Sequence, residues 1–179
     1  MIMAGFGGQG LLLAGKLLAE ASLSEGKEVS WLPSYGPEMR GGTANCTVVV
    51  SDTPVASPVI NEPHVLVAMN RPSLERFAAT VKKGGLIIIN SSMIDIDSGR
   101  KDVKHVFIPA NEEARALGTD KAANMVILGA FVALTGAASL ESVTQWMEHQ
   151  FEGKAKIIAT NKKALQRGYD LAKAQEVKA

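Results

Sequence analysis

The amino-terminal half of the chain alternates between short apolar runs and stretches with helical spacing, and few folds accommodate that alternation. Runs rich in Val and Ile predict strands near 1–4, 29–32, 44–50, 65–69, 86–90 and 105–108. Apolar positions three and four residues apart predict intervening helices at 9–26 and 72–82. This order of elements predicts an α/β fold, with a doubly wound, mostly parallel sheet and helices on both of its faces.

The chain becomes helical after Pro109, and no strand pattern returns. Three helices are expected in this part, at 122–134, 140–151 and 156–173. With 179 residues, of which 46% are hydrophobic, the chain is long enough to bury one sizeable core. We therefore expect a single domain over 1–179, with a sheet part at 1–109 and a helical C-terminal third at 110–179 that covers the sheet.

Charge and cysteine content argue against several classes of function. The 19 basic residues are nearly balanced by 18 acidic ones, so no overall positive field exists to attract nucleic acid or an anionic membrane surface. The longest apolar run, 125–134, is far shorter than the ~20 residues of a membrane-spanning helix. No basic and apolar leader precedes Gly5, so we expect a cytoplasmic protein. Cys46 is the only cysteine, which leaves no disulfide and no cysteine cluster for a metal.

A glycine-rich loop follows the first predicted strand. The stretch "GFGGQG", residues 5–10, fits the pattern G-x-G-x-x-G and opens the first predicted helix. Glycines at such a turn let a phosphate or carboxylate approach the free N–H groups of the helix start, where the helix dipole favours an anion. The same glycines also permit close packing of strand and helix, and the sequence leaves both interpretations open. The candidate binding residues of the loop are Gly5, Gly7, Gly8, Gln9 and Gly10.

The loop does not by itself indicate a nicotinamide cofactor. In dinucleotide-binding domains an acidic residue at the end of the second strand binds the ribose hydroxyls. Here Glu28 precedes the second strand, and Trp31, Pro33 and Ser34 occupy its carboxyl end. The glycine loop therefore supports a doubly wound fold more strongly than it supports NAD binding.

The stretch "SYGPEMRGG", residues 34–42, follows the second strand and contains hardly any apolar side chain. Ligands of open α/β sheets bind beyond the carboxyl ends of the strands, where this stretch, the glycine loop and the polar ends of two further strands should meet. Arg40 is suited to clamp a phosphate or carboxylate bidentately, although an ion pair with Glu38 is the alternative. The candidate binding residues are Ser34, Tyr35, Gly36, Glu38, Arg40, Gly41, Gly42, Asn70 and Ser91.

Five stretches together resemble the gamma subunit of 2-oxoacid:ferredoxin oxidoreductases, of the pyruvate/ketoisovalerate oxidoreductase gamma-domain family. They are "GFGGQG", "SYGPEMRGGTANC", "AMNRPSLERF", "GGLIIINSS" and "KAANMVILGA". Residues Tyr35, Gly36, Glu38, Arg40 and Gly41 fit the Y-G-x-E-x-R-G-x loop of pyruvate-type relatives. The "TANC" and "NSS" segments resemble the 2-oxoglutarate type most closely.

The resemblance implies a Rossmann-like subunit of a hetero-oligomeric enzyme of anaerobic metabolism. Such enzymes oxidatively decarboxylate a 2-oxoacid to an acyl-coenzyme A and reduce ferredoxin. The resemblance further implies that alpha and beta subunits hold thiamine diphosphate and its Mg, and that iron–sulfur clusters lie on other subunits, including a ferredoxin-like delta subunit. This chain would then hold no cofactor and no catalytic residue of its own, be inactive alone, and help to bind coenzyme A.

Three alternatives remain open at this level. The chain can serve an enzyme for another 2-oxoacid, such as pyruvate, a branched-chain acid or indolepyruvate. It can also be a free-standing NAD(P)-binding oxidoreductase, against which the missing acidic residue speaks. A scaffold that binds only partner subunits is the third.

Overall fold

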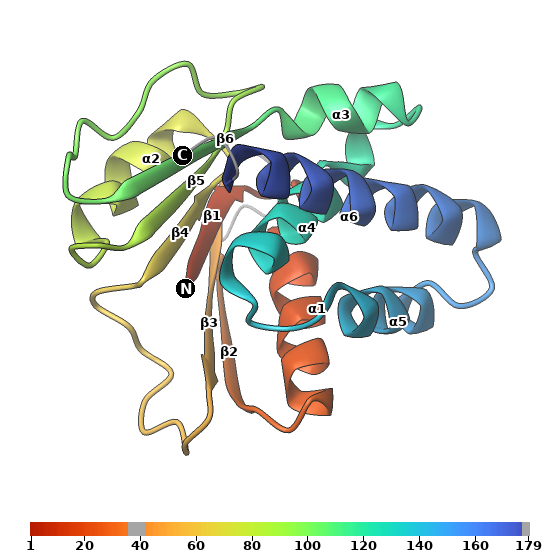
Figure 1. Ribbon diagram of the computed structural model, residues 1–179, viewed down its shortest axis with the longest axis horizontal. Helices are drawn as coiled ribbons and strands as arrows, with labels where there is room; N and C mark the ends of the chain where they lie inside the picture. The colour runs from red at the N-terminus through yellow and green to blue at the C-terminus, as the bar shows by residue number, and fades with distance from the viewer. Residues whose placement is uncertain (36–41, 177–179) are drawn as a thin grey trace.

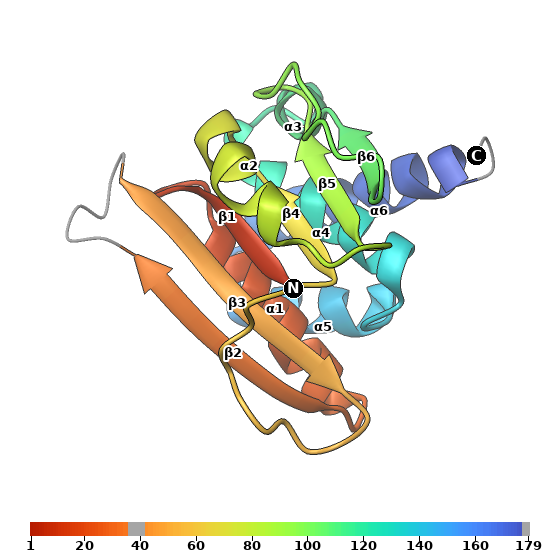
Figure 2. The ribbon, with the colours of Figure 1, turned by 90° about the vertical axis from the view of Figure 1, so that its left-hand side faces the viewer.

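The strands form one six-stranded sheet in the order β2-β3-β1-β4-β5-β6 (Figure 2). The computed structural model describes residues 1–35 and 42–176 of the chain. The strands are β1 Ile2–Phe6, β2 Glu28–Tyr35, β3 Thr43–Ser51, β4 Val65–Ala68, β5 Leu86–Asn90 and β6 Lys104–Ile108. Each lies where its apolar run predicted it, because Val and Ile pack well on a pleated surface buried on both faces.

The sheet has a parallel part and a hairpin. Strands β1, β4, β5 and β6 pair in parallel, whereas β3 is antiparallel to both β1 and β2. This mixed sheet confirms the predicted fold class of a mostly parallel α/β sheet. The reversed direction of β3 was not predicted, since an apolar run carries no information about the direction of its strand.

Helices cover both faces of the sheet (Figure 1). They are α1 Leu11–Ser24, α2 Arg71–Phe77, α3 Ala110–Ala116, α4 Ala123–Thr135, α5 Leu140–Gln150 and α6 Ala155–Glu176. Helix α2 lies on one face, and α1, α4, α5 and α6 lie on the other (Figure 1). No helix in the described part of the chain is long and apolar enough to cross a membrane.

Two helix predictions need correction. The helix expected at 72–82 ends earlier, because a 3-10 turn at Ala78–Thr80 follows α2 and Val81 is already extended. Helix α3 was not predicted at all. Its sequence "ANEEARA" buries only Ala110 and Ala114, so it carries no apolar periodicity that would distinguish it from a loop.

The larger core lies between the sheet and the four helices of the second face. Helix α4 is buried from Ala123 to Ala133, with the sheet on one side and α6 on the other. The α4 and α6 backbones approach closely at Gly129 and Gly168. A Cβ atom on Gly129 would lie 1.9 Å from the Leu165 carbonyl oxygen, so only glycine fits there.

The packing of α1 on the hairpin depends on a small buried thiol. Cys46 on β3 is fully buried, and its Sγ donates to the Leu11 carbonyl oxygen at 3.6 Å. A Cβ atom on Gly15 of α1 would lie 2.5 Å from the same Sγ. Burial raises the pKa of the Cys46 thiol to about 12, so the side chain stays protonated and serves packing rather than redox chemistry.

Candidate functional site

The carboxyl ends of β1, β4 and β5 meet at one edge of the sheet and are joined by amide side chains. Gln9 Oε1 accepts a hydrogen bond from the Phe6 N–H at 2.6 Å, and its Nε2 donates to the Met69 carbonyl oxygen at 3.4 Å. Asn90 Nδ2 donates to the same Met69 oxygen at 3.4 Å and to Asn111 Oδ1 at 2.8 Å. Gln9 therefore holds the glycine loop against β4.

The glycines of the loop differ in their surroundings. A Cβ atom on Gly5 would lie 2.3 Å from Gln9 Oε1 and 2.9 Å from Met69 Cβ, so Gly5 permits close packing. Gly8, with φ at 95°, has no atom within 4 Å of an added Cβ and faces open space. Packing thus explains Gly5, whereas Gly8 leaves its backbone accessible to a ligand.

Asn124 fixes the start of α1 from the opposite side. Its Nδ2 donates to the Gly10 carbonyl oxygen at 3.0 Å, and its Oδ1 accepts from the Met125 N–H at 3.0 Å. The side chain is only 5% exposed. Sequence reasoning missed Asn124, although a lone amide within an otherwise apolar helix of this kind is itself a signal.

A pocket of about 890 Å³ opens beside the glycine loop. Residues 8–10 form one wall, the segment 117–124 between α3 and α4 forms another, and the end of α5 with the first turns of α6 forms a third. Its polar lining residues absent from the sequence-based candidates are Asn111, Thr119, Asp120, Lys121, Asn124, Lys156, Thr160 and Asn161. This volume lies within the roughly 300–1,000 Å³ typical of small-molecule sites.

The electrostatics of the pocket favour an anion. Helices α1 and α4 both begin at its wall. No side chain caps α1 at Gly10, whereas at the start of α4 the Ala123 N–H donates to the Asp120 carbonyl oxygen and the Met125 N–H donates to Asn124 Oδ1. The first N–H groups of a helix have no intrahelical acceptor, and the helix dipole adds a partial positive charge there. Lys121 and Lys156 line the pocket with exposed side chains, while Asp120 pairs with Arg115 at 2.6 Å.

The remaining sequence-based candidates that the structure describes do not line the pocket. Gly42 approaches the glycine loop, since its carbonyl oxygen accepts from the Gly7 N–H at 2.8 Å. Ser34 is exposed near the end of β2, and Ser91 donates its N–H to the Ile108 carbonyl oxygen at 3.0 Å. The backbone of Tyr35 pairs with Ala44. Gly36, Glu38, Arg40 and Gly41 lie outside the described residues.

The side-chain contact of Asn70 stabilises the start of α2. It is 2% exposed, and its Oδ1 accepts from the Ser73 N–H at 2.9 Å, which caps α2. Its Nδ2 is buried and has no partner among the described residues. Ser34, Asn70 and Ser91 do not line the pocket, so the predicted edge divides into a pocket wall and a surrounding rim.

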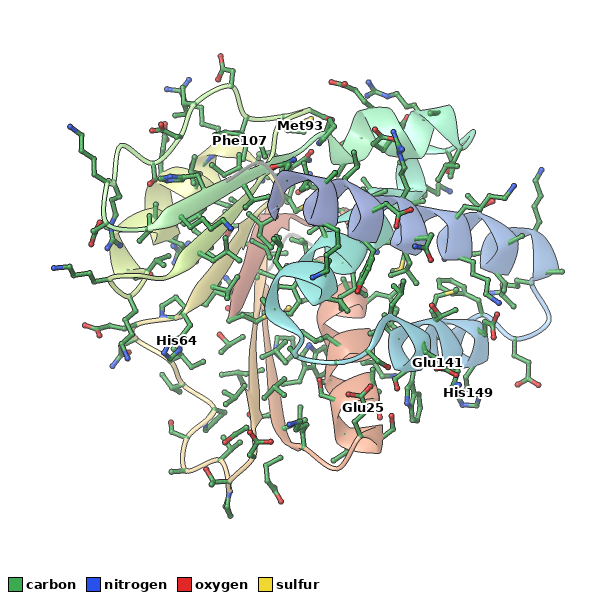
Figure 3. The ribbon with its side chains drawn as sticks, viewed as in Figure 1. Glu25, His64, Met93, Phe107, Glu141 and His149 are labelled. Atoms are coloured by element: carbon green, nitrogen blue, oxygen red, sulfur yellow. The ribbon has the colours of Figure 1, made fainter. Side chains whose placement is uncertain are left out.

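The structure offers no metal site in 1–35 and 42–176, where no group of three or more His, Cys, Asp or Glu side chains comes together. His64 and His149 lie on opposite sides of the molecule (Figure 3). Glu28 begins β2 and so lies at the end of that strand remote from the glycine loop. The acidic residue of a dinucleotide-binding domain is therefore not supplied by Glu28.

Solved structures of known proteins share this fold. The gamma subunit of a keto/oxoacid ferredoxin oxidoreductase from Geobacter sulfurreducens is 31% identical, with a TM-score of 0.82 and 97% of each chain covered. The 2-oxoglutarate:ferredoxin oxidoreductase from Magnetococcus marinus, with 2-oxoglutarate, coenzyme A and succinyl-CoA bound, is 26% identical with a TM-score of 0.88. The match covers 97% of this chain and 30% of that one.

Curated relatives carry the names of subunits for different 2-oxoacids. The ketoisovalerate oxidoreductase subunit VorA of Methanothermobacter marburgensis is 45% identical over 96% of this chain, which spans 36% of that relative's length. The 2-oxoglutarate synthase subunit KorC of Methanocaldococcus jannaschii is 33% identical over 96% of this chain and 92% of its own length. The profile of the family described as pyruvate ferredoxin/flavodoxin oxidoreductase matches residues 1–171. The chain therefore belongs to the pyruvate ferredoxin/flavodoxin oxidoreductase family, as its gamma-type part.

Proposed function

We propose that this chain is the gamma subunit of a 2-oxoacid:ferredoxin oxidoreductase and that its pocket binds the phosphates of coenzyme A. The observation that carries the proposal is that the uncapped start of α1 and the side chains of Lys121 and Lys156 meet at one pocket. Coenzyme A carries its negative charge on phosphates, which is the chemistry that helix N-termini and lysine side chains favour.

The overall reaction is balanced without any redox group in this chain. A 2-oxoacid and coenzyme A give the acyl-coenzyme A, carbon dioxide and a proton, and two electrons reduce two ferredoxins. In the proposal, alpha and beta subunits hold thiamine diphosphate with its Mg, and partner subunits, including a ferredoxin-like delta subunit, hold the iron–sulfur clusters.

The 2-oxoacid has two candidates, each favoured by a different observation. The "TANC" and "NSS" segments favour 2-oxoglutarate, and a relative of matching length is named a 2-oxoglutarate synthase subunit. The identity of 45% to a ketoisovalerate oxidoreductase subunit, against 33% to that relative, favours a branched-chain 2-oxoacid. Comparing kcat/KM of the assembled cytoplasmic complex for 2-oxoglutarate, 2-oxoisovalerate and pyruvate separates them.

The experiment that tests the phosphate site uses the assembled complex with Lys121→Ala and Lys156→Ala combined. We expect the KM for coenzyme A to rise roughly tenfold, since two charge-assisted contacts are lost. The decarboxylation half-reaction, measured without coenzyme A, should keep the wild-type rate. A matched control is Lys163→Ala, an exposed lysine of α6 that does not line the pocket. An unchanged KM for coenzyme A in the double variant contradicts the proposal.

A further inference from the structure

The pocket contains a buried amide that the protein leaves without a partner. Asn161 of α6 is 7% exposed and lines the pocket. Within the described part of the chain its side chain neither donates nor accepts a hydrogen bond, whereas Gln9, Asn111 and Asn124 on the other walls each have one. The only fully enclosed side-chain atom without a partner among the described residues is Asn70 Nδ2, so the unpaired amide of Asn161 is accessible from the pocket and can pair with a ligand there.

Helix packing does not provide that explanation. Asn161 stands at the head of the buried stripe of α6, followed by Ala164, Leu165, Gly168 and Ala172. An apolar side chain at this position would continue the stripe without leaving polar atoms unpaired. The neighbouring Thr160 hydroxyl is already engaged, since it donates to the Lys156 carbonyl oxygen at 3.0 Å. Of the uncharged polar side chains on this wall, Asn161 is therefore the one that has both a free donor and a free acceptor.

We propose that Asn161 recognises the adenine base of coenzyme A, an inference that rests on the proposed function. An asparagine amide places one donor and one acceptor side by side, which matches the paired donor and acceptor on an edge of adenine. Phe151, Ile157 and Leu13 line the same pocket and offer apolar surface to the flat ring. With the phosphates at the starts of α1 and α4, the base then reaches the wall formed by α6.

The pantetheine arm of coenzyme A also carries amides, so the test must separate the two ends of the ligand. Adenosine 3′,5′-bisphosphate contains the base without the arm, and 4′-phosphopantetheine contains the arm without the base. Both are tested as inhibitors competing with coenzyme A in the assembled complex. The variants are Asn161→Leu, close in size but unable to form hydrogen bonds, Asn161→Ala as a smaller second variant, and Lys163→Ala as the exposed control on the same helix.

Asn161→Leu should weaken coenzyme A and the bisphosphate roughly tenfold, the worth of one to two hydrogen bonds, and leave 4′-phosphopantetheine unchanged. The melting temperature of this variant should equal or exceed that of the wild type, because no protein hydrogen bond is lost. The proposal is wrong if the bisphosphate retains its affinity, if only 4′-phosphopantetheine weakens, or if melting falls by several degrees in both Asn161 variants.

Failure of the phosphate site is distinguishable from failure of this inference. If the Lys121 and Lys156 double variant leaves coenzyme A binding unchanged while Asn161→Leu weakens the bisphosphate, the phosphates lie elsewhere and the base site stands. If the double variant weakens coenzyme A and Asn161→Leu does not, the phosphate site stands and the adenine assignment is rejected.

Discussion

Asn124 joins the starts of two helices that are far apart in the sequence, because its Nδ2 donates to the Gly10 carbonyl oxygen at 3.0 Å across 114 residues. Gly10 precedes α1 in a left-handed conformation with φ at 73°, and Asn124 lies in the first turn of α4. A Cβ atom on Gly10 would lie 2.4 Å from Asn124 Nδ2. One amide therefore sets the geometry of the wall at which both helix starts face the pocket.

Replacing Asn124 should loosen that wall. In Asn124→Leu the Gly10 carbonyl oxygen loses the Asn124 donor and keeps the Ala14 N–H, while the Met125 N–H loses its side-chain acceptor. We expect a loss of about 1–3 kcal/mol in the free energy of unfolding. The KM for coenzyme A in the complex should rise with it, while the decarboxylation half-reaction is retained. Urea unfolding and half-reaction kinetics measure the two effects. A variant as stable as the wild type would show that the Asn124 contacts do not hold the loop.

Gly10→Ala tests the same contact from the other side. The added methyl group must displace the Asn124 side chain. The alanine must also keep the positive φ of this position, which costs an L-amino acid about 1 kcal/mol or more. We expect lower stability than in Asn124→Leu and a comparable defect in coenzyme A binding. For stability, Gly8→Ala is the matched control, because it shares the positive φ but meets no atom within 4 Å. Equal losses of stability in the two variants would assign the loss to backbone conformation alone.

Any side chain at Gly129 or Gly168, where α4 and α6 cross, should destabilise the protein. In Gly168→Ala the new Cβ would lie 1.8 Å from the Val126 carbonyl oxygen. This oxygen belongs to the backbone, so it cannot move aside as a flexible side chain can. Overpacking of this kind costs about 3 kcal/mol or more, and denaturant unfolding measures it. Ala159→Met enlarges an exposed position of α6 and should have little effect. Wild-type stability of Gly168→Ala would mean that the helices are further apart.

Substitutions of Asn70 test whether this candidate residue stabilises the fold or binds the ligand. Asn70→Ala removes the cap of α2 and should cost about 1 kcal/mol of stability, whereas Asn70→Ser retains an oxygen that accepts from the Ser73 N–H. Both variants should bind coenzyme A like the wild type, since Asn70 does not line the pocket. Weaker binding of coenzyme A by the stable Asn70→Ser variant would show that Asn70 belongs to the binding site.

Cys46 should be chemically silent in the folded protein. Burial raises the pKa of its thiol from 9.0 to about 12, so the nucleophilic thiolate is scarce at pH 8 and the sulfur is inaccessible. Iodoacetamide should label it only after unfolding. Because the folded pKa is the higher one, the stability that this thiol contributes is present below pH 9 and declines as the pH rises toward 12. Rapid labelling of the native chain would show that β3 and α1 separate readily.

The sequence predicted the sheet better than it predicted the pocket. The strands and the meeting of their carboxyl ends follow from local apolar runs and from the geometry of parallel strands. The wall made by 117–124 and by the start of α6 was missed, because it is brought to the glycine loop only by the packing of α4. Asn124 and Asn161 could have been recognised from the sequence, because each places an amide where the helical pattern predicts an apolar side chain.

The structure gives the sequence-based candidates different positions and roles. Gln9 has both ends of its amide engaged with the protein, so it positions the loop. Gly8 and Gly10 line the pocket, whereas Ser91 does not. A local motif shows that a loop is unusual, but it cannot show which atoms of that loop the rest of the fold will use.

Hydrogen–deuterium exchange of the assembled complex, with and without coenzyme A, tests the central claim most directly. We expect coenzyme A to slow exchange of the backbone amides in 8–13 and 121–125, where α1 and α4 begin. Amides of the short segment that begins α2, 70–74, should be unaffected and serve as the internal reference. Protection confined to other parts of the complex, with unchanged exchange in 8–13 and 121–125, would contradict the claim that the start of α1 and the neighbouring Lys121 segment receive the phosphates.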